Sequence, residues 1–254
     1  MMASPLVTVF PDLEQLSLAA ATHFLTLAQA KQITGQPFVI ALNGGGTPQR
    51  LFEWLGQPPY RDQIDWTQVH IFWGDERCVP PTETGSNFHQ AWSAWLRHVP
   101  IPPINLYRVR GEMEPAAAAQ DYAQQLQTYA ATIMPAPRWP FPLFDLVWLG
   151  MGADGHTAAL FPGPLTPAEE TQTVISVNAV YGGRPARRVT LTPWVFNKAR
   201  HIVVMATGEQ KAGTVAAALY GPHQPEKYPI QRIQPEEGEI GWWLDNAAAG
   251  QLPA

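Results

Sequence analysis

An aspartate and a histidine stand two residues apart in a glycine-rich turn, at Asp154 and His156. The turn follows the apolar run 146–149, which we expect to be a buried strand, and Pro162-Gly163-Pro164 ends it. A carboxylate beside an imidazole can orient the ring, and histidine is the natural general base near neutral pH. The pattern therefore predicts proton-transfer chemistry at this turn, with His156 as the base.

The same turn contains a G-x-G-x-x-G pattern at Gly150, Gly152 and Gly155, which is typical of dinucleotide-binding turns. Such a turn needs a following helix, yet residues 156–161 are roughly half of even a short helix of about ten to twelve residues. The next apolar segment, 174–177, does not end in an acidic residue that could bind a ribose. These features disfavour a nicotinamide cofactor, and we interpret the glycines as space for a substrate.

A second glycine-rich turn joins the expected strand 38–42 to an expected helix at 49–55. Its residues are Asn43, Gly44, Gly45, Gly46 and Thr47, followed by Pro48. Backbone N–H groups and the positive end of a helix favour an anion here, and glycine lets a phosphate approach closely. The turn is not a P-loop, because no Gly-Lys-Ser/Thr follows. An ordinary tight turn is the alternative, but three successive glycines and a threonine favour phosphate binding.

Charged side chains follow the third expected strand, Val69–Trp73, in the run Asp75-Glu76-Arg77. Arg77 could bind a phosphate or carboxylate with two hydrogen bonds, and Asp75 could orient an imidazole or hold a sugar hydroxyl. A surface cluster of ion pairs is the alternative. Cys78 could be a thiolate activated by Arg77. Because no partner base is visible, we interpret it as a packed structural cysteine.

Basic residues later in the chain could complete a phosphate site. Arg184, Arg187 and Arg188 precede an expected strand, and Lys211 falls in the first turn of an expected helix. A cation in a first helical turn opposes the helix dipole unless an anion is bound there. A solvated side chain is the alternative to a phosphate shared by Lys211, Arg77 and the glycine turn.

The sequence gives little support to a metal site or a serine nucleophile. It contains neither a G-x-S-x-G nor an H-E-x-x-H pattern, and one cysteine cannot supply a Cys-x-x-Cys zinc site. The other six histidines lie in apolar elements or lack glycine-rich surroundings, so we interpret them as structural or surface residues. If the chemistry is hydrolysis, the expected nucleophile is water activated by His156.

Alternating strands and helices must position these residues. Strands are expected at 6–10, 38–42, 69–73, 106–109, 146–149, 174–177, 189–192 and 202–206, with 240–244 a further candidate; helices at about 12–31, 49–55, 86–96, 115–131, 193–199 and 209–219. Continuous apolar strands that alternate with helices predict a parallel sheet covered on both faces. Ligands of such sheets bind beyond the carboxyl ends of the strands, where the three polar turns fall.

Length and composition predict one globular α/β domain over residues 1–254. The chain is 46% hydrophobic and 15% charged, and no linker or repeat divides it. No apolar run approaches the ~18–20 residues that span a bilayer, and the start lacks a signal-peptide pattern. The net charge of −5 disfavours nucleic acid as a partner. We expect a cytoplasmic monomer or homodimer that binds neither membranes nor nucleic acids.

Five motifs, in this order, resemble those of the 6-phosphogluconolactonase family. They are N-G-G-G-T-P (43–48), F-W-G-D-E-R-C-V-P (72–80) with S-N (86–87), L-G-M-G-A-D-G-H-T-A-A-L-F-P-G (149–163), R-R-V-T-L-T (187–192) and G-E-Q-K-A (208–212). The resemblance covers nearly the whole chain. It implies a three-layer αβα fold with a mostly parallel central sheet, similar to glucosamine-6-phosphate deaminase and ribose-5-phosphate isomerase. It also implies cofactor-independent hydrolysis of 6-phospho-D-glucono-1,5-lactone in the oxidative pentose phosphate pathway.

The resemblance implies roles for individual residues. His156 is the expected base, with Asp154 or Asp75 orienting it. The substrate-binding set expected from it is Asn43, Gly44, Gly45, Gly46, Thr47, Arg77, Asn87, Arg187, Arg188 and Lys211. Two positions depart from the family pattern: Gly46 stands where serine is usual, and Gly85 stands where aspartate is common. Both departures concern how the substrate is held and leave the acid–imidazole pair intact.

Two other functions stay open at this point. A phosphosugar isomerase or aminosugar deaminase could use the same phosphate turn with Asp75 as its base. It would abstract a carbon-bound proton, so solvent deuterium would enter its product. A non-catalytic phosphosugar sensor, of the kind found in sugar-responsive repressors, should carry an N-terminal DNA-binding segment. An expected first strand at Leu6 leaves no room for one.

Overall fold

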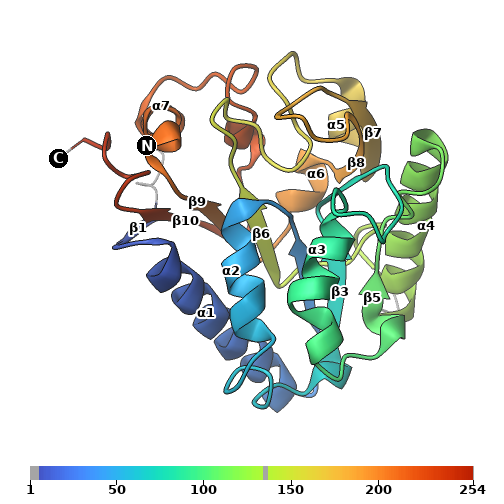
Figure 1. Ribbon diagram of the computed structural model, residues 1–254. Helices are drawn as coiled ribbons and strands as arrows, with labels where there is room; N and C mark the ends of the chain where they lie inside the picture. Colours follow the sequence, from blue (N-terminus) through green and yellow to red (C-terminus); the bar gives the residue numbers. More distant parts are fainter. Residues whose placement is uncertain (1–5, 134–136, 254) are drawn as a thin grey trace.

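Parallel strands form a seven-stranded central sheet (Figure 1). The computed structural model describes residues 6–133 and 137–253. Across the sheet the order is β1 (Leu6–Phe10), β10 (Glu239–Asp245), β9 (His201–Ala206), β6 (Leu146–Gly150), β2 (Phe38–Leu42), β3 (Val69–Trp73) and β5 (Leu106–Tyr107). Every neighbouring pair is parallel, so the carboxyl ends of these strands lie along one edge.

Side chains that alternate along the strands fill two cores, one on each face of the sheet. In β2, Val39 and Ala41 belong to one buried cluster, whereas Phe38, Ile40 and Leu42 belong to the other. This is the period of two that a strand imposes. Because both sets are apolar, β2 can only be stable when layers cover both faces of the sheet.

Helices cover both faces and confirm the predicted three-layer fold (Figure 1). On one face lie α1 (Leu13–Ile33), α2 (Gly46–Leu55) and α3 (Asn87–Ala94); on the other lie α4 (Pro115–Ile133), α6 (Pro193–Phe196) and α7 (Ala212–Tyr220). The start of α1 is set by Asp12, whose carboxylate accepts a hydrogen bond from Gln15 N at 2.9 Å. No helix in residues 6–133 or 137–253 combines the length and apolarity needed to cross a membrane.

Three further strands form a separate antiparallel sheet, which corrects the prediction of a single parallel sheet. Their order is β4 (Asp75–Arg77), β8 (Arg187–Leu191) and β7 (Val174–Asn178). Only residues 179–186 join β7 to β8, too few for the crossover that a parallel pair requires. The pairing of β4 with β8 places Arg77 opposite Arg188. Residues 75–77, which were expected to form a polar turn, are thus a strand that connects this sheet to the carboxyl edge of the central sheet.

Several element boundaries differ from the predicted ones. Helix α2 begins at Gly46 rather than Gln49, β5 is only two residues long, and α6 ends at Phe196. The segment expected as one helix at 209–219 divides into a 3₁₀ turn, Glu209–Lys211, and α7. A short helix, α5 (Pro167–Thr171), precedes β7. The single-domain prediction includes residues 1–5, 134–136 and 254, which lie outside the described residues, and it stays a prediction.

Trp148 connects the middle of the sheet to the helical layer on one face. It is 1% exposed, and its ring centroid lies 5.5 Å from that of Phe24 and 6.4 Å from those of Phe52 and Trp95. Changing Trp148 to alanine should lower the free energy of unfolding by about 3–5 kcal/mol, because it leaves a large cavity. Urea denaturation measures this loss.

Trp92 is the matched control, since 40% of its surface is exposed. Its change to alanine should cost less than about 1 kcal/mol. Equal losses for the two variants would contradict a core centred on Trp148.

Candidate active site

A cavity of about 180 Å³ lies at the carboxyl edge of the central sheet. It is lined by the turn 43–48 after β2, by Asp75 and Arg77 of β4, and by residues of the turn after β6, His156 among them. Arg188 of β8 and Lys211 complete its wall. The fold therefore brings the three polar turns together at one place, as parallel strand order predicts.

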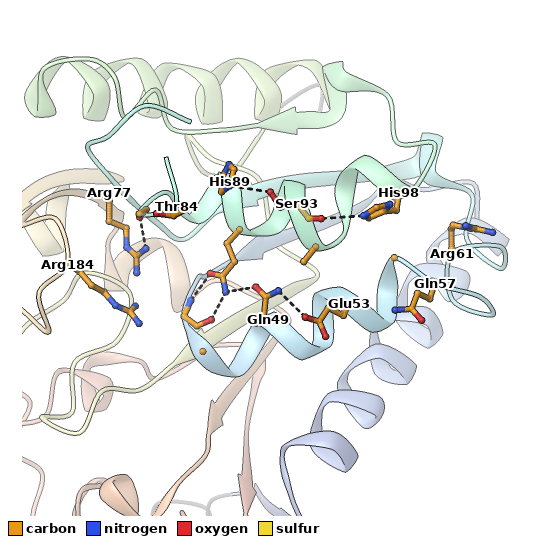
Figure 2. A pocket seen from close by; sticks show the side chains of 16 residues that line it. Gln49, Glu53, Gln57, Arg61, Arg77, Thr84, His89, Ser93, His98 and Arg184 are labelled. Atoms are coloured by element: carbon orange, nitrogen blue, oxygen red, sulfur yellow. Dashed lines mark hydrogen bonds between the residues drawn. The ribbon is translucent and has the colours of Figure 1, made fainter. Parts of the chain in front are cut away.

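A wider groove of about 1010 Å³ opens beside this cavity, between α2 and α3 (Figure 2). Gly45, Gly46, Arg77 and Arg184 line both spaces. Figure 2 shows the side chains of Arg77 and Arg184 near each other at one end of the groove. An anion that enters along the groove would therefore meet two guanidinium groups before it reaches His156.

The acid–imidazole pair forms as predicted. Nδ1 of His156 lies 2.6 Å from Oδ1 of Asp154, and His156 N donates to the same oxygen at 3.1 Å. Partial burial is the largest single effect on the pKa of Asp154 and raises it, but the hydrogen bonds to the carboxylate and its charge interaction with His156 together outweigh burial and lower that pKa. An ionised Asp154 accepts the Nδ1 proton, so the free lone pair of the neutral ring is on Nε2. This is the arrangement a general base requires.

Glycines in this turn make room for the pair. A Cβ atom at Gly152 would stand 2.1 Å from Nδ1 of His156 and 2.5 Å from Oδ1 of Asp154. Gly155 has a φ of +83°, a left-handed conformation that favours glycine, and its N–H donates to Gly152 O at 3.0 Å. The turn itself thus explains two of the glycines in the G-x-G-x-x-G pattern.

The amino end of α2 faces the cavity with free backbone donors. No side chain caps this helix, whose N-cap is Gly45. The N–H of Gly45 donates to Oε1 of Gln90 at 3.0 Å, and Nε2 of Gln90 donates to Gly45 O at 2.6 Å. The N–H groups of Gly46 and Thr47 lie at the positive end of the helix dipole and could donate to an anion.

Asn87 lies behind the glycine turn rather than in the cavity lining. Its Nδ2 donates to the carbonyl oxygen of Asp75 at 2.8 Å and to Oδ1 of Asp75 at 3.0 Å. A Cβ atom at Gly44 would stand 1.8 Å from Oδ1 of Asn87, so this glycine permits the contact. The substrate-binding role predicted for Asn87 stays a prediction, and the contacts of this side chain within the protein hold Asp75 in place. Asn43 is likewise fixed, because its Nδ2 donates to Trp148 O at 2.7 Å.

Glu76 joins β4 to the start of α3, a role that sequence reasoning missed. Its buried carboxylate accepts hydrogen bonds from the backbone N–H groups of Arg77 (2.7 Å), Asn87 (2.6 Å) and Phe88 (2.8 Å), and from Oγ of Ser86 (2.9 Å). Burial raises the pKa of Glu76 to about 7, against these four donors, which lower it. The sequence did contain a signal for this role of Glu76. An acidic residue follows a strand, and a serine and an asparagine stand at the next expected helix start.

Adjacent arginines on β8 face opposite ways. Arg188 is 2% exposed and lines the cavity, whereas Arg187 is exposed and does not. This alternation follows from the strand period, and it places Arg188 and not Arg187 at the cavity; the substrate-binding roles predicted for both stay predictions. Burial lowers the pKa of Arg188, while the charge of Asp75 opposes this shift. Among the described residues, Nε and one terminal nitrogen of Arg188 have no hydrogen-bond partner.

Arg77 and Lys211 add two cations to the same wall. Arg77 is 7% exposed, and its Nη1 donates to Gly85 O at 2.7 Å. Burial lowers the pKa of Lys211, and the charge of Asp245 partly offsets this shift. Three cations that are at least partly buried around a small cavity favour a ligand of negative charge.

The surroundings of Cys78 disfavour a reactive thiolate, in line with its interpretation as a structural residue. Burial raises the pKa of its thiol to about 11, so the thiolate is disfavoured near neutral pH. Within residues 6–133 and 137–253, no group of three histidine, cysteine or acidic side chains could hold a metal ion. Two aromatic contacts of His156 escaped the sequence analysis: the rings of Phe161 and Tyr181 pack against its imidazole.

Comparison with known proteins identifies the family. The family model described as glucosamine-6-phosphate isomerases/6-phosphogluconolactonase matches residues 11–242. A 6-phosphogluconolactonase of Haemophilus influenzae is 34% identical over 243 residues, which cover 96% of this chain and 98% of that protein. The chain belongs to the glucosamine-6-phosphate isomerase/6-phosphogluconolactonase family.

Solved structures agree with this assignment. The 6-phosphogluconolactonase from Trypanosoma cruzi matches with a TM-score of 0.83 and 27% identity, covering 100% of this chain and 99% of that one. A monomeric glucosamine-6-phosphate deaminase matches with a TM-score of 0.78 at 19% identity, covering 96% and 99% of the two chains. The second match shows the shared fold alone and confirms the predicted similarity to deaminases. The similarity to ribose-5-phosphate isomerase stays a prediction.

Gly152 tests the geometry of the acid–imidazole pair. Its change to alanine should separate Asp154 from His156, because the new Cβ overlaps both side chains. We expect kcat for lactone hydrolysis to fall about 10²-fold or more, the scale of losing an oriented base, with an unchanged circular dichroism spectrum.

Gly213 of α7 provides the control. A Cβ there would meet only Gln251 Oε1, at 3.3 Å, so alanine should leave kcat unchanged. Full activity of the Gly152→Ala variant would refute the close packing of the pair.

Proposed function

We infer that the chain hydrolyses 6-phospho-D-glucono-1,5-lactone to 6-phospho-D-gluconate, as a step of the oxidative pentose phosphate pathway. The observation that carries this proposal is the Asp154–His156 pair on a cavity whose other wall is cationic. One half of such a site can activate water, and the other can hold a phosphate. Relatives that are named 6-phosphogluconolactonases support the reaction itself.

The phosphate of the substrate would bind between the amino end of α2 and the cationic wall. Gly46 and Thr47 offer backbone N–H groups, while Arg77, Arg188 and Lys211 offer charge. Arginine can bind two phosphate oxygens at once, and lysine acts as a point charge. Serine, which is usual in the family where Gly46 stands, would add a hydroxyl donor. Here the phosphate would receive a hydrogen bond from the backbone N–H alone at this position.

Binding through the phosphate would hold the lactone ring beside His156. Fixing one end of the substrate makes the attack effectively unimolecular, which lowers the entropic part of the barrier. Nε2 of His156 would take a proton from water as the oxygen of that water bonds to C1 of the lactone. The carbonyl π electrons move to oxygen and give a tetrahedral oxyanion, which the cationic wall and backbone N–H groups can stabilise.

Collapse of this intermediate would reform the C1 carbonyl and break the bond to the ring oxygen. The imidazolium returns its proton to that oxygen, so the open product carries a carboxyl group at C1 and a hydroxyl at C5. Asp154 stabilises the imidazolium through its bond to Nδ1. Asp75 was the other candidate for orienting the ring, but its carboxylate accepts from Asn87 and stands near Arg188. We assign Asp75 to holding the cationic wall.

The proposed reaction uses only water and side chains, so it requires no cofactor. We further propose that it takes place in the cytoplasm, since a chain with one cysteine needs no oxidising compartment for disulfides. The residues of one chain are enough to form the cavity, and we further propose that the protein works as a monomer or a homodimer.

His156 provides the direct test of this function. Acid release from fresh 6-phosphoglucono-δ-lactone should be faster with the protein than in buffer alone. Changing His156 to alanine should lower kcat by about two to four orders of magnitude, the usual contribution of a general base. The exposed His223 is the matched control, and its alanine variant should keep full activity.

Near-normal turnover by the His156 variant would refute its role as the base. Running the reaction in deuterium oxide separates hydrolysis from isomerisation or deamination. Hydrolysis places no deuterium on carbon, whereas an isomerase that abstracts a carbon-bound proton would label its product.

The negative charge of Asp154 should determine the pH at which the acid limb of the pH–rate profile falls. Burial raises the pKa of Asp154, but its hydrogen bonds and its charge interaction with His156 together lower that pKa, so Asp154 stays ionised at neutral pH. Changing Asp154 to asparagine removes the negative charge that stabilises imidazolium. The acid limb of kcat/KM should therefore move to lower pH, and the plateau should fall by about 10²–10⁴-fold through loss of the oriented tautomer. A shift to higher pH would contradict the pairing.

A further inference from the structure

The loop between β7 and β8 reaches the catalytic imidazole from the second sheet. Tyr181 and Arg184 form an antiparallel bridge across the two glycines between them, and Arg184 N donates to Tyr181 O at 3.1 Å. Gly182 and Gly183 have φ values of +57° and +67°. Two consecutive left-handed residues are the mark of a type I′ hairpin turn, whose twist matches that of the flanking strands. Tyr181 is thus held by a well-defined turn.

The side chain of Tyr181 meets the ring of His156 directly. The two ring centroids lie 4.3 Å apart at an interplanar angle of 69°. On another side, Phe161 stacks on the imidazole at 4.8 Å and 23°. The rings of Phe161 and Tyr181 are themselves 6.1 Å apart. His156 therefore occupies a slot between two aromatic rings, one nearly parallel to it and one nearly perpendicular.

The two ring contacts restrict a rotation of the imidazole that the hydrogen bond to Asp154 does not restrict. That bond fixes the position of Nδ1, but the terminal torsion of histidine is soft, so the ring can still tilt about Nδ1. Aromatic pairs prefer edge-to-face and offset-stacked contacts, which fix the planes of the rings. Tyr181 and Phe161 supply one contact of each kind. Together with Asp154 they determine where Nε2 points.

We propose that Tyr181 is a positioning residue for the His156 imidazole in lactone hydrolysis. This inference rests on the proposed function, since it concerns the orientation of the proposed base. The aromatic ring of Tyr181, and not its hydroxyl group, carries the role, because the contact with His156 is between rings. The second sheet thereby contributes to proton transfer as well as to anion binding through Arg188.

Kinetics of two Tyr181 variants test the proposal. Tyr181→Ala should lower kcat about 10- to 100-fold through misplacement of Nε2, with KM within about twofold of the wild type. Tyr181→Phe should restore kcat to within about twofold, because phenylalanine keeps the ring contact. Tyr220→Ala is the control for loss of a tyrosine, since Tyr220 is 50% exposed at the end of α7, and it should leave both constants unchanged.

The same change in a His156→Ala background shows whether Tyr181 acts through the base. With the imidazole absent, Tyr181→Ala should cause no further loss of residual activity. Three results would overturn the proposal: a raised KM with normal kcat, which would make Tyr181 a substrate contact; an equal loss of kcat in both backgrounds; or a Tyr181→Phe variant as slow as Tyr181→Ala.

A readout that does not need turnover separates this inference from the proposed function. Failure of the wild-type protein to open the lactone would refute the function alone. The imidazole nitrogen resonances of His156, assigned by their loss in His156→Ala, report the state of the ring directly. Tyr181→Ala should shift or broaden them while Tyr220→Ala leaves them unchanged. Unchanged resonances in Tyr181→Ala would refute the positioning role.

Discussion

The parallel order of the central sheet is the constraint on which the site depends. It brings every strand's carboxyl end to one edge, so turns that are far apart in the chain must share a small volume. This concentrates polar groups where water is scarce, and each of them needs a partner. Asn43 bonds to the carbonyl of Trp148, and Asn87 bonds to Asp75. The polar side chains of the site therefore fix one another through hydrogen bonds within the protein.

The small antiparallel sheet adds a buried cation to the carboxyl edge of the central sheet. Without β8, the edge would carry a base and a glycine turn but would lack the most deeply buried cation, Arg188. The ring of Phe161 connects the two functions, since it stacks on His156 and lies 5.2 Å from the guanidinium carbon of Arg188. One aromatic side chain therefore contacts both the proposed base and the proposed anion-binding arginine.

Much of the fold and of the candidate site could be predicted from the sequence, because the patterns that indicate them lie within short segments of the chain. Apolar runs such as 38–42 and 146–149 marked the central strands, and glycines beside Asp154 and His156 marked the catalytic turn. The remainder depended on long-range pairing. Which of Arg187 and Arg188 faces the cavity follows from the register of β8 against β4, which no local pattern determines. The contact between Tyr181 and His156 likewise requires knowing that a hairpin from another sheet folds over the turn.

The cationic wall has a consequence for the end of the reaction. Hydrolysis converts the uncharged lactone group into a carboxylate, so the product carries one more negative charge than the substrate. The buried guanidinium of Arg188 therefore attracts the product more strongly than the molecule it was made from. Arg184, which is exposed at the mouth, is screened by water and salt and retains the product less. Because attraction is strong in the dry interior and weak at the wet rim, the product is held more tightly inside than at the mouth, and its release costs more free energy than release of the less charged substrate.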